Sequence, residues 1–153
     1  MAAATVSVIL DRLHAINQLL GVPYKSARYF PPSLDGAKLP LLCAIPGQNA
    51  RSSNHTNQKF NTRDYLIVCF VGEFLQGLPT QSAQTNAETL MPLMESLYDP
   101  RNRLQLAAGD SGLDNVNSAD LRTDSGIIDY QGTGMAAIIY TLTVVSERTV
   151  SLL

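Results

Sequence analysis

The sequence predicts an α+β fold, in which a mainly antiparallel sheet of four to five strands has two helices packed on one face. Three observations predict it: two segments repeat apolar residues at helical spacing, several short segments are continuously apolar, and the last strands follow one another with no helix between them. Consecutive strands favour antiparallel pairing, because parallel neighbours need a long crossover. The chain has 153 residues, the size of one domain, so we predict a single domain over residues 1–153.

The first helix is predicted over about residues 3–20. Gly21 offers a C-terminal cap, and Pro23 prevents continuation of the helix. A short strand is expected within Tyr24–Phe30. The apolar residues that share one face of the predicted helix are Val6, Ile9, Leu10, Leu13, Ile16 and Leu20.

Two buried strands are predicted next, the first at Leu39–Ile45 and the second, which is the strongest in the chain, at about residues 62–73. The second strand is apolar on both faces, and such a strand must be covered on both sides. Two helices cover one face of the sheet. A neighbouring copy of the chain or folding of the sheet on itself would cover the other, and the first alternative argues for an oligomer.

A long polar loop is predicted between these strands, at about residues 46–61. Residues 48–61 have almost no apolar content and carry two bases and no acid. Ordinary connections are about 4–6 residues long, and longer structureless loops tend to be functional or disordered. As an out-and-back arm this loop would reach roughly 20–25 Å, beyond the radius of gyration of about 15 Å expected for the domain. We predict contacts with a partner; a mobile surface loop is the alternative.

The second half of the chain is expected to contain a helix and further strands. Thr85–Glu88 fits a capping box, and the helix then runs to Tyr98 before Asp99-Pro100 ends it. Pro92 either sits near the first turns or kinks this helix. The expected strands are Arg103–Leu106, Asp120–Tyr130 and Gly134–Val145, with a loop at residues 107–118 and a turn at Asp129–Gly134.

Composition excludes several classes of protein. The chain is 45% hydrophobic and 16% charged with a net charge of −2, which excludes a disordered chain and argues against nucleic-acid binding. No apolar run is long enough to span a membrane, and the N-terminal segment lacks the pattern of a signal peptide. We therefore expect no membrane partner and no specific nucleic acid.

Charge is divided unevenly along the chain. Residues 1–63 hold seven basic and two acidic side chains, whereas residues 64–153 hold four basic and eleven acidic ones. This division either brings copies of the chain together or is cancelled when folding mixes the two halves.

The residues that could carry chemistry are few. His14 and His55 have no nucleophile motif around them, and Cys43 and Cys69 lie in apolar runs, which predicts buried thiols. Metal-ligand spacings and phosphate-binding glycine loops are absent from the sequence. We therefore expect no enzyme, no cofactor and no metal, and we interpret the acidic cluster as solvated. Its members are Asp110, Asp114, Asp120 and Asp124.

The order of these segments resembles the tail terminator (tail completion) family of long-tailed bacteriophages. The resemblance covers essentially the whole chain and rests on element order and on the final hairpin, where a YxG-type turn precedes a tyrosine-bearing strand. The segments that carry it, after the N-terminal amphipathic helix, are LPLLCAIPG (39–47), RDYLIVCFVGEF (63–74), TNAETLMPLMESLYDP (85–100) and IDYQGTGMAAIIYTLTVVSE (128–147).

The resemblance implies a structural virion protein without turnover. Such a subunit forms a ring, usually a hexamer, at the head-proximal end of the tail; it stops polymerisation of the tail tube and receives the head-side connector. A sheath would be a further partner in a contractile tail, and assembly would take place in the host cytoplasm. The alternatives are another neck ring component (connector or stopper), a non-viral α+β ligand-binding domain with an apolar pocket and, least favoured, an enzyme.

The charge division supplies candidate contacts for such a ring. Complementary basic and acidic surfaces of one subunit would meet head to tail around the ring. The candidates for contacts between subunits or with the tube are Arg51, His55, Lys59, Arg63, Asp110, Asp114, Asp120 and Asp124.

Overall fold

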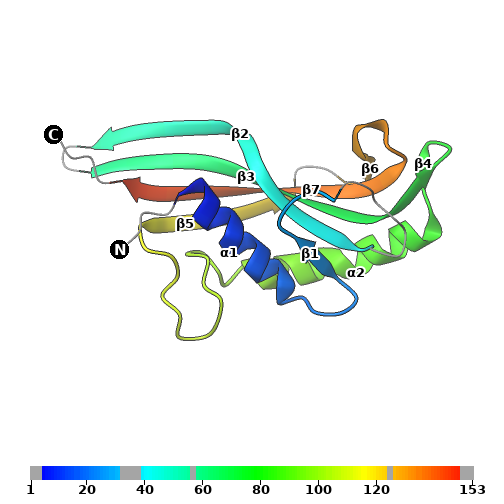
Figure 1. Ribbon diagram of the computed structural model, residues 1–153, viewed down its shortest axis with the longest axis horizontal. Helices are drawn as coiled ribbons and strands as arrows, with labels where there is room; N and C mark the ends of the chain where they lie inside the picture. The colour runs from blue at the N-terminus through cyan, green and yellow to red at the C-terminus, as the bar shows by residue number, and fades with distance from the viewer. Residues whose placement is uncertain (1–4, 32–38, 56–57, 124–125, 149–153) are drawn as a thin grey trace.

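The computed structural model describes residues 5–31, 39–55, 58–123 and 126–148, and it has the expected α+β architecture (Figure 1). Two helices lie against a sheet of seven strands with the central order β1-β2-β3-β7-β5, to which β4 and β6 add short pairings. The elements are α1 (Val6–Gln18), β1 (Lys25–Ala27), β2 (Leu41–His55), β3 (Gln58–Leu75), β4 (Leu78–Pro79), α2 (Gln81–Tyr98), β5 (Val116–Thr123), β6 (Ile128–Asp129), the 3₁₀ helix η2 (Tyr130–Gly132) and β7 (Met135–Arg148).

The sheet is mixed, so the prediction of a four- to five-stranded and mainly antiparallel sheet is only partly right. β1 runs parallel to β2, whereas β2, β3, β7 and β5 pair antiparallel. β1 is joined to β2 by a connection between Ala27 and Leu41. Residues 32–38 of that connection lie outside the described part of the chain.

α1 forms as its apolar periodicity predicts, although it begins at Val6 and ends at Gln18. The Thr5 side chain accepts a hydrogen bond of 3.2 Å from the Val8 backbone N–H, which satisfies one of the free donors of the first turn. Ile9, Leu13 and Ile16 are buried against the sheet.

α2 begins earlier than the sequence predicts, so the proposed capping box is wrong. Thr80 is the N-cap and accepts a hydrogen bond of 3.3 Å from the Ala83 N–H, while Thr85 lies inside the helix. The polar residues from Gln81 to Gln84 carry little apolar signal, which is why the start was placed too late. Pro92 lies in the second half of α2, not in its first turns.

The predicted polar loop is in fact a β-hairpin. β2 and β3 continue through it in register from the Ala50–Arg63 pair to the His55–Gln58 pair, and β7 joins β3 as far as Lys59. We call the segment between Gly47 and Asp64 the arm. It extends the sheet toward one end of the molecule (Figure 1). Its backbone is paired, but its sequence is polar apart from Ala50 and Phe60, so no apolar alternation marks it as strand.

β3 separates two cores, as its doubly apolar sequence requires. Tyr65, Ile67 and Cys69 face the helices and belong to the larger core. Val68 and Phe70 belong to a smaller core on the opposite face.

Segments of the same chain cover this smaller core. The Phe70 ring packs at 5.9 Å from Phe30 and at 5.1 Å from Tyr130 of η2, in edge-to-face geometry. The apolar far face therefore gives no argument for an oligomer at this position.

The region after α2 differs from the prediction in two ways. Arg103–Leu106 forms turns, not a strand, and fully buried Leu104 fills the core from a loop with a φ of 59°. The predicted strand at Asp120–Tyr130 is divided into β5, which begins already at Val116, and the short β6. The final strand is confirmed as β7.

The described helices include none with the length and apolar character needed to cross a membrane.

Candidate functional site

The arm carries a ladder of polar side chains across three strands. Asp64 accepts hydrogen bonds from the Asn49 amide at 3.2 Å and from the Thr143 hydroxyl at 2.8 Å, and so links β2, β3 and β7. A shallow hollow of 450 Å³ lies over this ladder, with Arg51 and Arg122 among its lining residues. The ladder fixes the arm to the sheet through side-chain hydrogen bonds.

The basic candidates of the arm lie on opposite faces of the sheet. Arg51 pairs in register with Thr62, which shares the face of Asp64, whereas Arg63 pairs with Val144 on the helix-covered face. Arg63 lines a hollow of 170 Å³ beside the start of α1. The backbones of His55 and Lys59 belong to the arm, and their side chains lie outside the described part of the structure.

Among the acidic candidates, Asp110 is engaged within its own chain. Its carboxylate accepts hydrogen bonds from the backbone N–H of Leu106 at 2.8 Å, from that of Gly112 at 2.9 Å and from Arg12 at 3.2 Å. The two backbone donors, together with the Arg12 guanidinium, hold the pKa of Asp110 below its ordinary value. Arg12 comes from the basic half of the chain, so folding cancels part of the charge division here.

The pH dependence of Asp110 is a direct test of this geometry. A lowered pKa means that the contribution of this carboxylate to stability is complete above the unfolded-state value of about 4 and is lost as the pH falls through the folded-state value. We expect a carboxyl titration by NMR to place Asp110 below 3.8. Arg12→Met should raise the titration midpoint of Asp110 only part of the way to its ordinary value, because the two backbone donors have the larger influence on its pKa. A midpoint at or above the ordinary value in the parent chain would contradict the loop geometry.

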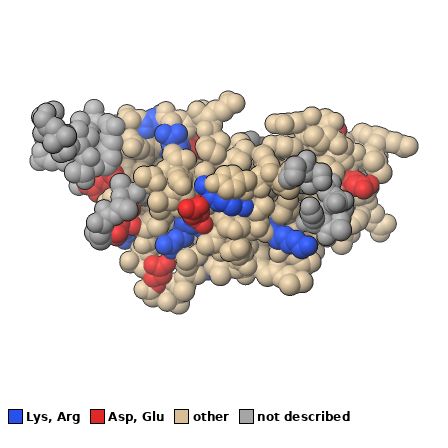
Figure 2. All heavy atoms as spheres, viewed as in Figure 1, with Lys and Arg blue, Asp and Glu red and all other residues tan. Residues whose placement is uncertain are grey.

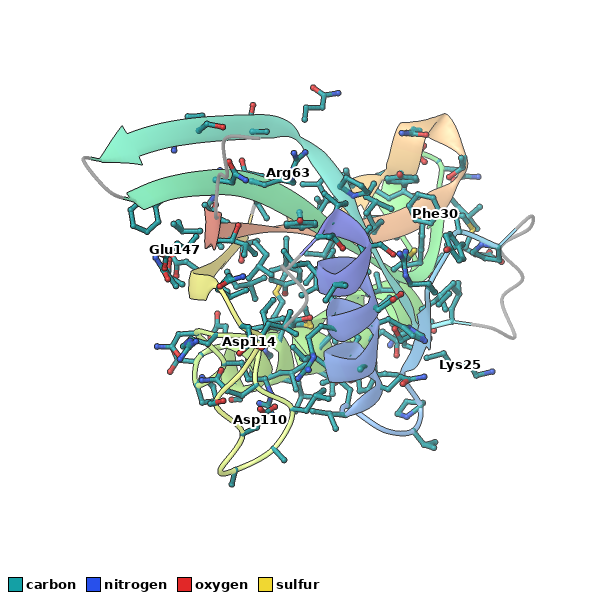
Figure 3. The ribbon with its side chains drawn as sticks, turned by 60° about the vertical axis from the view of Figure 1, so that its left-hand side comes forward. Lys25, Phe30, Arg63, Asp110, Asp114 and Glu147 are labelled. Carbon is teal, nitrogen blue, oxygen red and sulfur yellow. The ribbon has the colours of Figure 1, made fainter. Side chains whose placement is uncertain are left out.

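The other described acidic candidates are solvent-exposed. Asp114 is exposed in the loop before β5, and Asp120 is exposed on β5 itself. Asp124 lies outside the described residues. Figure 3 shows Arg63 on the arm, well separated from Asp110 and Asp114 in the loop.

A groove accompanies the outer edge of β5. It has a volume of 620 Å³ and lies between β5 and the C-terminal half of α2. Glu95, Asp99, Asp120 and Arg122 are among its lining residues. Sequence analysis did not identify Glu95, Asp99 or Arg122: Arg122 lies on β5 itself, and only the packing of α2 against the sheet brings Glu95 and Asp99 beside that strand.

The charged side chains do not form one large patch of either sign on the face that carries α1. Figure 2 shows basic and acidic side chains interspersed there. Arg28, for example, pairs with Asp11 at 2.6 Å. The basic arm and the acidic groove instead lie at opposite edges of the sheet, on β2 and on β5.

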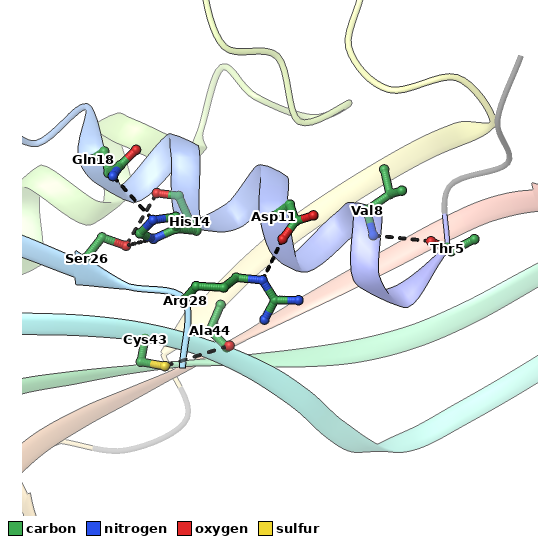
Figure 4. A network of polar contacts seen from close by, with 9 residues as sticks. All are labelled: Thr5, Val8, Asp11, His14, Gln18, Ser26, Arg28, Cys43 and Ala44. Carbon is green, nitrogen blue, oxygen red and sulfur yellow. Dashed lines mark hydrogen bonds and ion pairs between the residues drawn. The ribbon is translucent and has the colours of Figure 1, made fainter. Parts of the chain in front are cut away.

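His14 takes part in a structural network, shown in Figure 4. Its Nδ1 lies 2.8 Å from the Ser26 hydroxyl, and that hydroxyl donates to the His14 carbonyl at 3.4 Å. The ring Nδ1–H is then the donor to Ser26, and Gln18 is the donor to Nε2 at 3.3 Å. In this arrangement the imidazole does not take the proton of Ser26, so the pair is no activated nucleophile.

The two cysteines are buried free thiols, as the sequence predicts. Burial raises the pKa of Cys43 to about 11 and raises that of Cys69 as well. Both side chains are therefore protonated at neutral pH and are poor nucleophiles. Within the described residues, no group of three or more His, Cys, Asp or Glu side chains is arranged to hold a metal ion.

An exposed apolar pair marks the end of the molecule opposite the arm. Leu75 and Leu78 face each other across the β3–β4 turn and are 54% and 69% exposed. Neither was predicted as a contact residue, and the signal that could have identified them is the Gln76-Gly77 turn between two leucines.

Searches with protein-family models and among curated proteins found no match to this chain.

Proposed function

We propose that this chain is a ring-forming structural subunit that caps the tail tube of a long-tailed bacteriophage. The ring, a hexamer by resemblance to tail terminators, would stop polymerisation of the tube and present a surface to the head-side connector. The observation that carries the proposal is the arm, because it continues the sheet beyond the two helices with a paired backbone and a largely polar sequence. A hairpin of this kind suits contacts with a neighbouring protein.

The proposed activity needs no catalytic group. One face of the ring would match the last ring of tube subunits, and the other face would differ from it, so that no further tube subunit binds. The tube protein and the connector would be the partners, with a sheath protein added in a contractile tail. The chain would be located in the virion, at the head-proximal end of the tail, after assembly in the host cytoplasm.

The alternatives make different demands on the same surfaces. A ligand-binding α+β domain would use an apolar pocket, whereas the groove beside β5 and the hollow over the arm are lined largely by charged and polar side chains. A neck connector or stopper would also form a ring, and it would differ in its partner. The partner is therefore what an experiment must identify.

The test combines the mass of the purified chain with its effect on tube growth. We expect a hexamer by native mass spectrometry, and we expect tubes growing from purified cognate tail tube protein to stop elongating when the ring is added. The heat-unfolded chain is the control. A monomer at every concentration together with unchanged tube length would contradict the proposal, and a ring that leaves tube growth unchanged would favour a connector.

A further inference from the structure

Both edges of the sheet are open for most of their length in the described part of the chain. β1 pairs with β2 only over Leu41–Cys43, so the outer edge of β2 has no described partner strand from Ala44 to His55. β5 ends the sheet on the other side. Open edges present rows of unpaired N–H and C=O groups, which a strand from another chain can pair.

The two open edges are joined by one row of paired residues that crosses the whole sheet. Ala50 pairs with Arg63, Arg63 with Val144, and Val144 with Ala119. Ala50 on β2 and Ala119 on β5 are thus the two ends of one row across the sheet. Three successive antiparallel pairings also make β2 and β5 run in opposite directions.

This geometry suits a closed ring. A rotation about an axis parallel to the strands does not shift a copy along the strand direction. The β2 strand of the rotated copy would therefore lie beside β5 of the first copy, antiparallel to it, with Ala50 opposite Ala119. The surfaces used are different on the two copies, and a contact of this head-to-tail type closes into a ring when the rotation allows it. A β5–β5 contact would instead use the same edge on both copies and give a two-fold dimer.

Charge supports pairing between different edges. The segment from residue 48 to 63 contains Arg51, Lys59 and Arg63 and no acidic residue. The residues that line the groove beside β5 include three acidic ones and one basic one. Arg51 and Asp120 lie on the same face of the sheet, through their pairing with Thr62 and Thr143, and lie two rows apart, so they would be diagonal neighbours across the contact.

We propose that copies of this chain join by edge addition: the outer edge of β2 in one copy pairs antiparallel with the outer edge of β5 in the next and fills the groove along β5. The proposal rests on the proposed function, because it names how the ring subunits meet. It assigns Ala50 of one copy to a position directly opposite Ala119 of the next.

Cysteine cross-linking tests this register. Directly opposite residues of antiparallel strands have Cα atoms about 4.5–5.5 Å apart, within the range of a disulfide. We expect the A50C/A119C variant to give a ladder of covalent oligomers on oxidation, with bands up to the size of the ring. The native cysteines are buried and should not contribute. The matched control is S52C/A119C, which is two rows out of register and should give at least tenfold less cross-linking.

The single variants separate the alternatives. A dimer from A119C alone would show β5–β5 pairing, and a dimer from A50C alone would show β2–β2 pairing; either result would overturn the proposal. Failure of A50C/A119C to cross-link in a sample whose native mass is a ring would overturn edge addition and leave the proposed function standing. A cross-linked ring without effect on tube growth would support edge addition and contradict the capping function.

Charge reversal is a second test that does not depend on disulfide geometry. R51D and D120R should each raise the dissociation constant between subunits by roughly two- to fivefold, and the double variant should restore assembly. K25D is the matched control, because Lys25 is an exposed basic residue of β1 outside the proposed contact. Equal effects of R51D and K25D, or no recovery in the double variant, would overturn the proposal.

Discussion

Removal of the arm should leave a folded monomer that no longer forms a ring. The variant replaces residues 47–64 with Asn-Gly and so joins Pro46 to Tyr65, which are partners in the register of β2 and β3. Asn-Gly is the preferred two-residue connection of antiparallel strands. The buried core residues lie on either side of the deleted segment, the nearest being Ala44 and Tyr65. The deletion therefore removes no buried core residue, while most of the proposed β2 contact edge is lost.

The measurements are native mass, thermal unfolding and the length of tubes grown in the presence of the variant. We expect a monomer, a cooperative unfolding transition and tubes that elongate as if no cap were present. The control replaces only Thr56-Asn57, the two residues that connect His55 to Gln58, with Asn-Gly, and it should assemble like the parent chain. A ring that survives removal of the arm would show that the subunits meet elsewhere.

Sequence reasoning located the parts of this fold that bury apolar surface. α1 was predicted because its buried residues recur at helical spacing, and β3 because its central residues are apolar on both faces. Periodicity of this kind is a consequence of burial, so it is visible wherever a core exists. The start of α2 was misplaced because Thr80 caps a first turn that is mostly exposed.

The arm could not be predicted in the same way. Its two strands pair with each other, and the β3 strand also pairs with β7, which is far away in the sequence, as in the pair of Lys59 with Arg148. Ser52 and Asn61 stabilise the pairing through a side-chain hydrogen bond of 3.1 Å, and such a contact leaves no periodic signal. Polar composition alone therefore predicted a loop where the structure has two strands.

The candidate contact residues were identified only in part. Arg51 and Asp120 were chosen from the division of charge, and the sheet places them at its two open edges. Asp110 was chosen on the same ground, but its partner Arg12 is 98 positions away and only the fold brings them together. The division of charge therefore leaves Arg51 and Asp120 as candidates for an interface, whereas Asp110 is engaged within its own chain.

The loop that holds Asp110 should be strongly destabilised by Gly112→Ala. Gly112 has a φ of 93°, in the left-handed region, and a Cβ atom there would collide with the carbonyl oxygen of Arg103 and lie 2.7 Å from its Cβ. The left-handed conformation costs roughly 1–2 kcal/mol with a side chain, and overpacking costs typically about 1–3 kcal/mol. The carbonyl of Arg103 accepts the Leu113 N–H at 3.0 Å, and Leu104, the next residue, is fully buried. The collision is therefore transmitted to the core.

Gly109→Ala is the matched control in the same loop. Gly109 has a φ of 87°, but no atom lies within 4 Å of the position that a Cβ would take. Gly109→Ala should therefore carry only the cost of the left-handed conformation, without the cost of overpacking. Denaturant unfolding should show a loss of unfolding free energy of about 2–5 kcal/mol for Gly112→Ala and of about 1–2 kcal/mol for Gly109→Ala. Both variants are best compared at protein concentrations below ring assembly, because association stabilises the folded chain by mass action. Equal losses would show that Arg103 yields without cost and that the loop is not packed on the core through Gly112.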